Sequence, residues 1–376
     1  MLTESLVVLL LFAILITLMK SFFMLPGEAV MSFLNLCECF SCNELWVKEF
    51  NSPDTKLKEN IPIVDNNYVF ELNVLNEVLL SLTSKEHDCL YLTGPSGCGK
   101  TSLVQQIAAR LGWGVEQLTL CGKSDIDDLI GHSSLRRGNL CFEYGPLVRA
   151  MRFGEILLLN EIDLMPPADL AVLNDVLEGR PLTVSANLGE VIKPHRDFRV
   201  VATANSKGSG DRRGFYNGVR LQNQAFLDRW RFIEMTYPSV RAESVILKKC
   251  CTNLPEETLN RLLKLAVELR RDSNEEEITS VTSLSAPFST RSLIRVASIF
   301  EQCSDFVEPS RIIDMGFGSR LPAVEREYVK RLCADIFGNE AFQEKCAAQE
   351  KTQTESVADK GRIKKSVRRS TKKKIR

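Results

Sequence analysis

Apolar and polar positions change their spacing along the chain in a way that marks out its elements. Leucines from Leu72 to Leu82 recur at helical spacing, which predicts a helix. The apolar run that begins at Tyr91 predicts a buried strand. It leads through a glycine-rich stretch into residues 102–111, which have the pattern of a helix. After a first helix, the pattern therefore predicts a strand, a loop and a second helix.

Strands and helices continue to alternate after this unit. The predicted strands are 115–120, 155–163, 198–205 and 231–235, the predicted helices are 145–152, 167–177 and 224–230, and the predicted hairpins are 134–144 and 182–191. Such alternation is typical of a parallel sheet with helices on both faces. We therefore predict an α/β fold with hairpin insertions.

The last third of the chain has only helical spacing. Residues 258–269 and 290–300 are its clearest predicted helices, which favours an α-helical lid after the α/β domain. From about residue 349 the chain is polar and basic, and we expect this tail to be disordered.

The glycine-rich stretch fits G-x-x-x-x-G-K-[ST], the phosphate-binding loop, or P-loop. The P-loop and the residue after it comprise Gly94, Pro95, Ser96, Gly97, Cys98, Gly99, Lys100, Thr101 and Ser102. Glycines let backbone N–H groups turn around an anion, and the following helix adds its positive dipole end. Lys100 can reach the β- and γ-phosphates, and the Thr101 hydroxyl can hold Mg²⁺. The motif predicts binding of a nucleoside triphosphate such as ATP.

The strand predicted at 155–163 ends in Asn160, Glu161 and Asp163, where a P-loop ATPase has its second motif. That motif uses an Asp–Glu pair to orient Mg²⁺ and to polarise the attacking water. Asn160 has the size of Asp but lacks its charge, so it is a weaker partner for a hard cation. Glu161 remains the candidate base, and Asp163 is a candidate to supply the missing charge. We therefore expect nucleotide binding from the P-loop, whereas hydrolysis depends on Glu161.

Further polar residues stand where they can sense or stabilise a phosphate. Asn205 ends a predicted strand and can sense the γ-phosphate, although it can also simply cap a turn. Arg229 can reach the nucleotide of a neighbouring subunit, or can pair with Asp228 on the surface. Arg291 opens a predicted lid helix and can reach phosphate from there.

The charge of the chain is unevenly distributed. It has 48 Lys and Arg and 48 Asp and Glu, but residues 360–376 hold ten of the basic residues and no acid, which leaves the rest with a net charge of −10. An acidic body with a basic tail is unlike the basic face of a duplex-binding domain. We therefore predict no specific nucleic-acid partner.

The chain begins with an apolar run over residues 5–25, interrupted by Lys20. This length can span a bilayer, and the basic residues after it would then favour a cytoplasmic body. The alternative is that translation begins at Met24 or Met31 and that the run is an upstream extension. A cytoplasmic ATPase body, tethered to a membrane or not, fits both alternatives.

The motifs together resemble the AAA+ ATPases of the MoxR and dynein-related group. The stretches that carry the resemblance are 94–101, 128–131, 142–147, 157–161 and 201–205. Three others, 61–70, 208–218 and 228–230, are similar to the ATPase subunits of aerobic cobaltochelatases. The resemblance covers about residues 61–300 and leaves both ends of the chain unmatched.

The resemblance implies roles for these residues and a ring assembly. It makes Glu161 the catalytic base, Asn205 the first sensor, Arg229 the arginine finger and Arg291 the second sensor. It also implies a ring, commonly a hexamer, with ATP and Mg²⁺ between neighbours. The partner implied is a protein that often carries a von Willebrand A-type domain.

These observations favour an ATP-driven motor that remodels or activates a partner protein. The rival is a scaffold that binds ATP and oligomerises with little hydrolysis, and Asn160 favours it. The predicted divisions are an apolar segment at 1–25, a variable region and linker at 26–60, the nucleotide-binding domain at 61–237, the lid at 238–340 and the tail at 341–376.

Overall fold

The structure is a computed structural model that describes residues 30–42, 44–47, 49–51, 58–84, 88–136, 138–210, 218–274, 284–304 and 306–338. The chain divides into two compact units, Met1–Gly94 with Gly99–Met235, and Pro95–Cys98 with Thr236–Arg376. The predicted apolar segment at 5–25 and the basic tail lie outside the described residues. Within the described part of the chain, no helix is long and apolar enough to cross a membrane.

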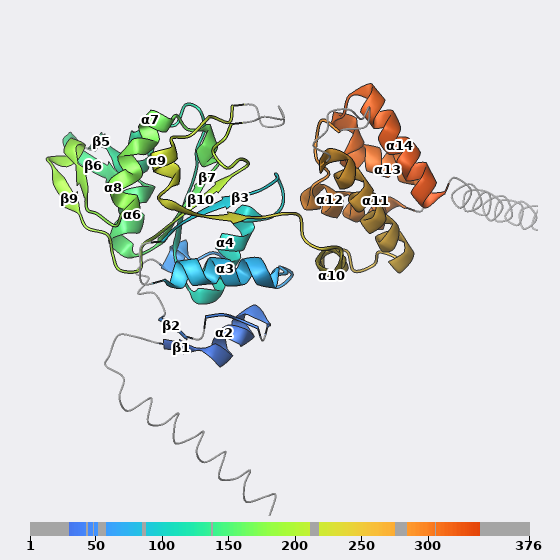
Figure 1. The fold of residues 1–376 in the computed structure, drawn as a ribbon, viewed down its shortest axis with the longest axis horizontal. Helices are drawn as coiled ribbons and strands as arrows, with labels where there is room; N and C mark the ends of the chain where they lie inside the picture. Colours follow the sequence, from blue (N-terminus) through green and yellow to red (C-terminus); the bar gives the residue numbers. More distant parts are fainter. Residues whose placement is uncertain are drawn as a thin grey trace, which may run out of the picture. The chain divides into compact units, whose positions relative to one another are not determined.

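A five-stranded parallel sheet forms the centre of the N-terminal unit (Figure 1). Its strands are β3 (Cys89–Thr93), β4 (Val115–Thr119), β7 (Ile156–Asn160), β10 (Arg199–Ala204) and β11 (Trp230–Glu234). They lie in the order β11-β3-β10-β7-β4. The predicted α/β fold is confirmed, because each of these strands runs parallel to its neighbours.

From Leu72 onward, the helices of this unit precede the first strand of the sheet or connect its strands. They are α3 (Leu72–Thr83), α4 (Lys100–Leu111), α5 (Ile126–Ile130), α6 (Pro146–Phe153), α7 (Pro167–Leu170), α8 (Asn174–Leu177) and α9 (Gln224–Leu227). The predicted helix over 167–177 is wrong in detail, because the 3₁₀ turn η3 (Ala171–Leu173) separates α7 from α8. Short 3₁₀ turns at helix ends are common where the backbone must tighten to follow a core.

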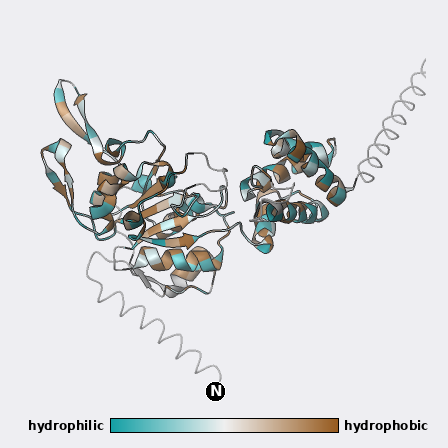
Figure 2. Ribbon diagram, turned by 45° about the horizontal axis from the view of Figure 1, so that its top comes forward, coloured by the Kyte–Doolittle hydropathy of each residue, from teal (hydrophilic) through white to brown (hydrophobic). Residues whose placement is uncertain are grey.

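Helices cover both faces of the sheet. In β7, Leu157 and Leu159 belong to a hydrophobic cluster that includes Val148 and Met151 of α6. Leu158 points to the opposite face, because side chains alternate along a strand, and it is also fully buried. Figure 2 shows hydrophobic residues along the central strands. Because the central strands are buried on both faces, they consist mostly of consecutive apolar residues.

The two predicted hairpins are present, and a polar contact joins them. β5 (Gly131–Arg136) pairs with β6 (Asn139–Tyr144), and β8 (Leu182–Val184) pairs with β9 (Glu190–Ile192). The hydroxyl of Tyr144 donates to a carboxylate oxygen of Glu190 at 2.7 Å. Both hairpins therefore form one connected extension of the N-terminal unit (Figure 1).

The region expected to be variable before residue 61 has structure of its own. β1 (Val30–Ser32) pairs with β2 (Glu49–Asn51), and α2 (Phe33–Phe40) lies between them in sequence. The 3₁₀ turn η1 (Lys58–Asn60) follows. These elements are three to eight residues long, which is too short to show a clear hydrophobic period.

The C-terminal unit is helical, as the sequence predicts. Its elements are α10 (Val240–Cys250), α11 (Glu256–Asn274), α12 (Thr290–Cys303), α13 (Pro309–Gly316), the 3₁₀ turn η5 (Gly318–Arg320) and α14 (Ala323–Phe337). The buried carboxylate of Glu243 in α10 joins three of these helices. Both terminal nitrogens of Arg270 in α11 donate to it at 2.8 Å, and the Thr290 hydroxyl of α12 donates to it at 2.7 Å.

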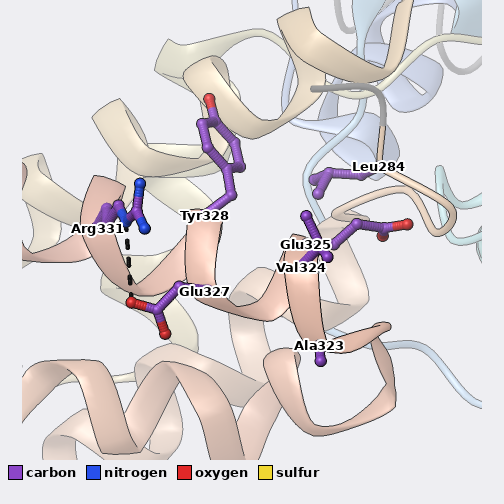
Figure 3. A pocket seen from close by; sticks show the side chains of 7 residues that line it. All are labelled: Leu284, Ala323, Val324, Glu325, Glu327, Tyr328 and Arg331. Atoms are coloured by element: carbon purple, nitrogen blue, oxygen red, sulfur yellow. Dashed lines mark ion pairs between the residues drawn. The ribbon is translucent and has the colours of Figure 1, made fainter. Parts of the chain in front are cut away.

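This unit also contains a cavity of about 530 Å³ beside α14 (Figure 3). Its lining comprises Leu284, Ala323, Val324, Glu325, Glu327, Tyr328 and Arg331. Arg331 and Glu327 form an ion pair at 3.8 Å on its wall. None of the predicted site residues lines this cavity.

Candidate nucleotide site

The P-loop connects β3 to α4. Gly94 and Gly99 have left-handed φ angles of 152° and 101°. A Cβ atom on Gly94 would lie 2.1 Å from the carbonyl oxygen of Met235, so only glycine fits there. Gly99 caps the N-terminus of α4, a helix of twelve residues that points its free N–H groups into the loop. The local geometry is that of an anion-binding turn.

Lys100 is the first residue of α4 and is only 8% exposed. Its ammonium group donates to the carbonyl oxygen of Gly94 at 2.8 Å and to the side-chain oxygen of Asn205 at 3.0 Å. These contacts hold the positive charge of Lys100 at the carboxyl end of β3, where the P-loop begins.

Asn160 ends β7 beside the second residue of α4. Its amide oxygen accepts hydrogen bonds from the hydroxyl of Thr101 at 2.7 Å and from that of Thr203 at 3.0 Å. A hydroxyl that donates its proton in this way keeps its lone pairs free for a cation. The donor set therefore fits a Mg²⁺ ion that Thr101 would bind directly and Asn160 would support through Thr101.

Glu161 follows Asn160 at a turn in the chain. It has a left-handed φ angle of 56°, which is a strained conformation for glutamate and is common at functional sites. Burial raises the pKa of the Glu161 carboxyl, and the nearby charge of Asp163 raises it further. Lys100 and the hydrogen bond from Asn205 act in the opposite direction. The net effect is a raised pKa, as expected for a general base.

Asn205 lies just after β10 and joins the P-loop lysine to the candidate base. Its side-chain oxygen accepts from Lys100, and its side-chain nitrogen donates to Glu161 at 2.7 Å. One amide therefore contacts both groups, which is more than turn capping requires. The structure brings Lys100, Glu161 and Asn205 into one cluster, with Thr101 and Asn160 beside it.

Asp163 is fully buried and accepts hydrogen bonds from the loop after β10. One of its carboxylate oxygens accepts from the backbone N–H groups of Asn205 and Ser206 and from the Ser206 hydroxyl, each at 3.1 Å. Its hydrogen bonds therefore fix the position of Asn205, whereas Thr101 donates to Asn160. Asp163 can therefore stabilise a bound cation only by electrostatic attraction at a distance, without a hydrogen bond to Thr101 or Asn160.

Arg229 follows α9 and lies outside this cluster. Its guanidinium forms an ion pair with Glu178, with nitrogen-to-oxygen distances of 2.6 and 2.7 Å, and also donates to the carbonyl oxygen of Ala225. The predicted surface alternative, a pair with Asp228, is replaced by this pair with Glu178.

Arg291 belongs to the C-terminal unit and is exposed on the first turn of α12. The tip of the P-loop, Pro95–Cys98, groups with the same unit. A Cβ atom on Gly97 would lie 2.7 Å from that of Ser289 and 3.7 Å from that of Arg291. The hydroxyl of Tyr237 also donates to the Ser96 carbonyl at 3.1 Å.

Two residues beside the cluster were not found from the sequence. Thr203 lies opposite Asn160 in the parallel pair of β10 and β7. The hydroxyl of Tyr68 lies 3.9 Å from the position of a Cβ on Gly99. Thr203 stands two positions before Asn205 on the same strand, and this spacing is the only signal of its role.

Part of the chain is similar in sequence to known proteins. Residues 89–229 match the AAA domain of the dynein-related subfamily. The chain is 30% identical to midasin of Dictyostelium discoideum over 57% of its own length. It is 30% identical to the aerobic cobaltochelatase subunit CobS of Sinorhizobium over 46% of its own length.

Among solved structures, the chain is similar to the Thermotoga maritima RuvB Holliday junction branch migration motor. The match has 18% identity, covers 69% of this chain and 72% of that one, and has a TM-score of 0.40. The chain spans 4% of the length of midasin and 53% of that of the cobaltochelatase subunit.

Proposed function

Because residues 89–229 form an AAA domain of the dynein-related subfamily, we propose that this chain binds ATP with Mg²⁺ and hydrolyses it to drive a conformational change. The observation that carries the proposal is the amide of Asn205, which contacts both Lys100 and Glu161. A P-loop lysine, a polar sensor and a raised-pKa carboxylate in one cluster suit phosphoryl transfer to water.

Binding rests on the P-loop and the start of α4. The β- and γ-phosphates would accept hydrogen bonds from the loop N–H groups and from Lys100. Thr101, supported by Asn160, would hold Mg²⁺, which supplies positive charge against the phosphate oxygens.

Hydrolysis rests on Glu161. Its carboxylate would take a proton from a water molecule whose oxygen forms the new bond to the γ-phosphorus. The bond from that phosphorus to the bridging oxygen breaks, and ADP leaves with the electron pair. The NH₂ group of Asn205 would hold Glu161 with one hydrogen and donate the other to the γ-phosphate, while Lys100 would turn from the Asn205 oxygen to the phosphate oxygens.

Assembly into a ring would complete the site. In a ring, commonly a hexamer, Arg229 would leave Glu178 and reach the γ-phosphate of a neighbour, as an arginine finger does. Arg291 would contact phosphate from the lid. We infer both roles from the resemblance to AAA+ ATPases.

The output would be movement of the hairpins against a partner protein. Leu135 and Leu140 form a cross-strand pair on β5 and β6 and are 74% and 75% exposed. Leu188, between β8 and β9, is fully exposed. Exposed leucines on two joined hairpins suit contact with another protein, for which a von Willebrand A-type domain is our candidate.

A second candidate is a scaffold that binds ATP and assembles with little turnover. Asn160 is the observation that favours it, because an amide polarises the cation site less than a carboxylate does.

Nucleotide binding and phosphate release by the full chain, measured with and without Mg²⁺, separate the two candidates. The motor predicts Mg²⁺-dependent turnover in the unaltered chain and loss of ATP binding in Lys100→Ala. Tight binding without turnover, with activity appearing only in Asn160→Asp, would instead establish the scaffold.

A further inference from the structure

The amide oxygen of Asn160 is shared by two hydroxyls from different elements. Thr101 donates from α4 at 2.7 Å, and Thr203 donates from β10 at 3.0 Å. Asn160 is 6% exposed and Thr203 is 2% exposed, so water has little access to this contact. A carbonyl oxygen has two lone pairs, and here each receives one hydroxyl proton.

Sheet register places Thr203 beside Asn160. The two residues are direct partners in the parallel pair of β10 and β7. Partners on neighbouring strands point to the same face, so their side chains lie side by side. Thr203 therefore contacts Asn160 from a rigid strand, and its β-branched side chain has few alternative rotamers.

An amide needs this support more than a carboxylate does. A carboxylate presents two equivalent oxygens, so rotation about its last bond changes nothing. An amide presents one oxygen and one NH₂ group. If the amide turned over, NH₂ would donate to Thr101, use one of its lone pairs and turn its proton toward the cation.

Thr101 donates to the neutral Asn160 and not to the nearby carboxylate of Asp163. The buried Asp163 accepts from the loop that contains Asn205 and Ser206. The orientation of the Asn160 amide therefore depends on the two hydroxyls that hold it.

We propose that Thr203 is a positioning residue that holds the oxygen of Asn160 toward Thr101, so that a neutral amide can support Mg²⁺ where a carboxylate is usual. This inference rests on the proposed function, since it concerns Mg²⁺ bound with ATP. Thr203 itself touches neither the cation nor the nucleotide.

The test is a set of four full-length variants: Thr203→Val, Thr203→Ser, Asn160→Asp, and Thr203→Val combined with Asn160→Asp. Valine keeps the shape of threonine and removes the hydroxyl, whereas serine restores it. The readout is equilibrium binding of a fluorescent ATP analogue during Mg²⁺ titration, with thermal melting to confirm that each variant is folded.

We expect Thr203→Val to raise the Mg²⁺ concentration for half-maximal tightening of nucleotide binding by roughly three- to tenfold, the effect of losing one neutral hydrogen bond. Thr203→Ser should restore the original value. In the Asn160→Asp background, Thr203→Val should change it by less than about twofold, because either carboxylate oxygen can accept from Thr101.

Two results would overturn the inference. An equal shift in both backgrounds would mean that Thr203 only supports the strand, and no shift in either would mean that it does not hold the amide. A failure of the proposed function looks different, because the unaltered chain would then bind no nucleotide at any Mg²⁺ concentration.

Discussion

At the scale of single residues, opposing influences act on Glu161. Burial and the charge of Asp163 raise the pKa of its carboxyl, and Lys100 and Asn205 lower it. A general base works only when deprotonated, so the pKa of Glu161 sets the pH below which the activity falls. Asn205 is the neighbour that can be changed without removing a charge.

We predict that Asn205→Ala moves the acidic limb of the profile of kcat/KM against pH to higher pH. The variant loses a hydrogen bond that favours the charged form of Glu161, so the pKa of this carboxyl rises further. Ser206→Ala is the matched control, because Ser206 donates to Asp163 in the same loop. A limb that stays in place in Asn205→Ala would exclude Glu161 as the titrating base.

The motif residues could be predicted because each follows the end of a strand or opens a helix. Lys100, Glu161 and Asn205 are brought together by the parallel order of three strands, which the alternation of elements already implied. The partners of Arg229 and Thr203 could not be predicted. Arg229 meets Glu178 only through the geometry of the turns that carry them, and Thr203 meets Asn160 only through the register of the sheet.

At the scale of elements, a buried carboxyl lies at the start of β7. Burial raises the pKa of Glu155 from its ordinary 4.5 to about 7, with a hydrogen bond from Asn60 as the main opposing influence. The side chain is fully buried and lies near the ion pair of Glu116 with Arg149.

We predict that Glu155→Gln stabilises the fold at pH 8. Between about pH 4.5 and 7 the folded chain binds more protons at Glu155 than the unfolded chain does, so the free energy of unfolding falls as pH rises. Glutamine cannot titrate and avoids this loss. The expected gain at pH 8 is on the order of 1–3 kcal/mol, and it should vanish below about pH 4.5.

Urea unfolding across this pH range checks the prediction. Glu116→Gln is the control, because it breaks a salt bridge with Arg149 at 2.7 Å and should destabilise the fold. A gain in Glu155→Gln that is the same at pH 4 and pH 8 would show that titration is not its cause.

The tip of the second hairpin offers a test of strain. Leu188 is fully exposed and has a left-handed φ angle of 54°. We predict that Leu188→Gly stabilises the fold by about 0.5–1 kcal/mol, because glycine adopts this conformation without steric cost. Leu140→Gly should destabilise the fold, since Leu140 is also exposed but lies in the extended strand β6. Destabilisation by both changes, seen in thermal melting, would mean that Leu188 is not strained.

The central strands and both hairpins could be read from the sequence because burial on both faces and turn residues leave clear patterns. The division of residues 167–177 into α7, η3 and α8 could not, since all three keep apolar residues on the buried side. The elements between Val30 and Asn51 were also missed. They are too short for a period to appear, and α2 is stabilised by tertiary contacts.

At the scale of the whole molecule, our account requires a ring in which Arg229 acts on a neighbour. We predict that Lys100→Ala and Arg229→Ala are each inactive alone and regain part of the ATPase activity when mixed. The first variant cannot bind ATP but offers Arg229, whereas the second binds ATP and receives that arginine from the first.

Subunit mixing at constant total concentration measures this recovery. A mixture of Lys100→Ala with Glu161→Gln is the matched control, because neither of these variants can supply a complete site. Activity of Arg229→Ala alone at the level of the unaltered chain would mean that the ion pair with Glu178 is the only role of Arg229.

Hydrolysis of ATP at the site formed by Lys100, Asn205 and Glu161 can be tested by comparing the unaltered chain with a single variant. Steady-state phosphate release and ATP affinity would be measured together on the unaltered full chain and on Glu161→Gln. We predict Mg²⁺-dependent turnover in the unaltered chain, and similar affinity with roughly 10²- to 10⁴-fold slower release in the variant. Equal rates in the two proteins, or ATP binding without any release in the unaltered chain, would contradict the account.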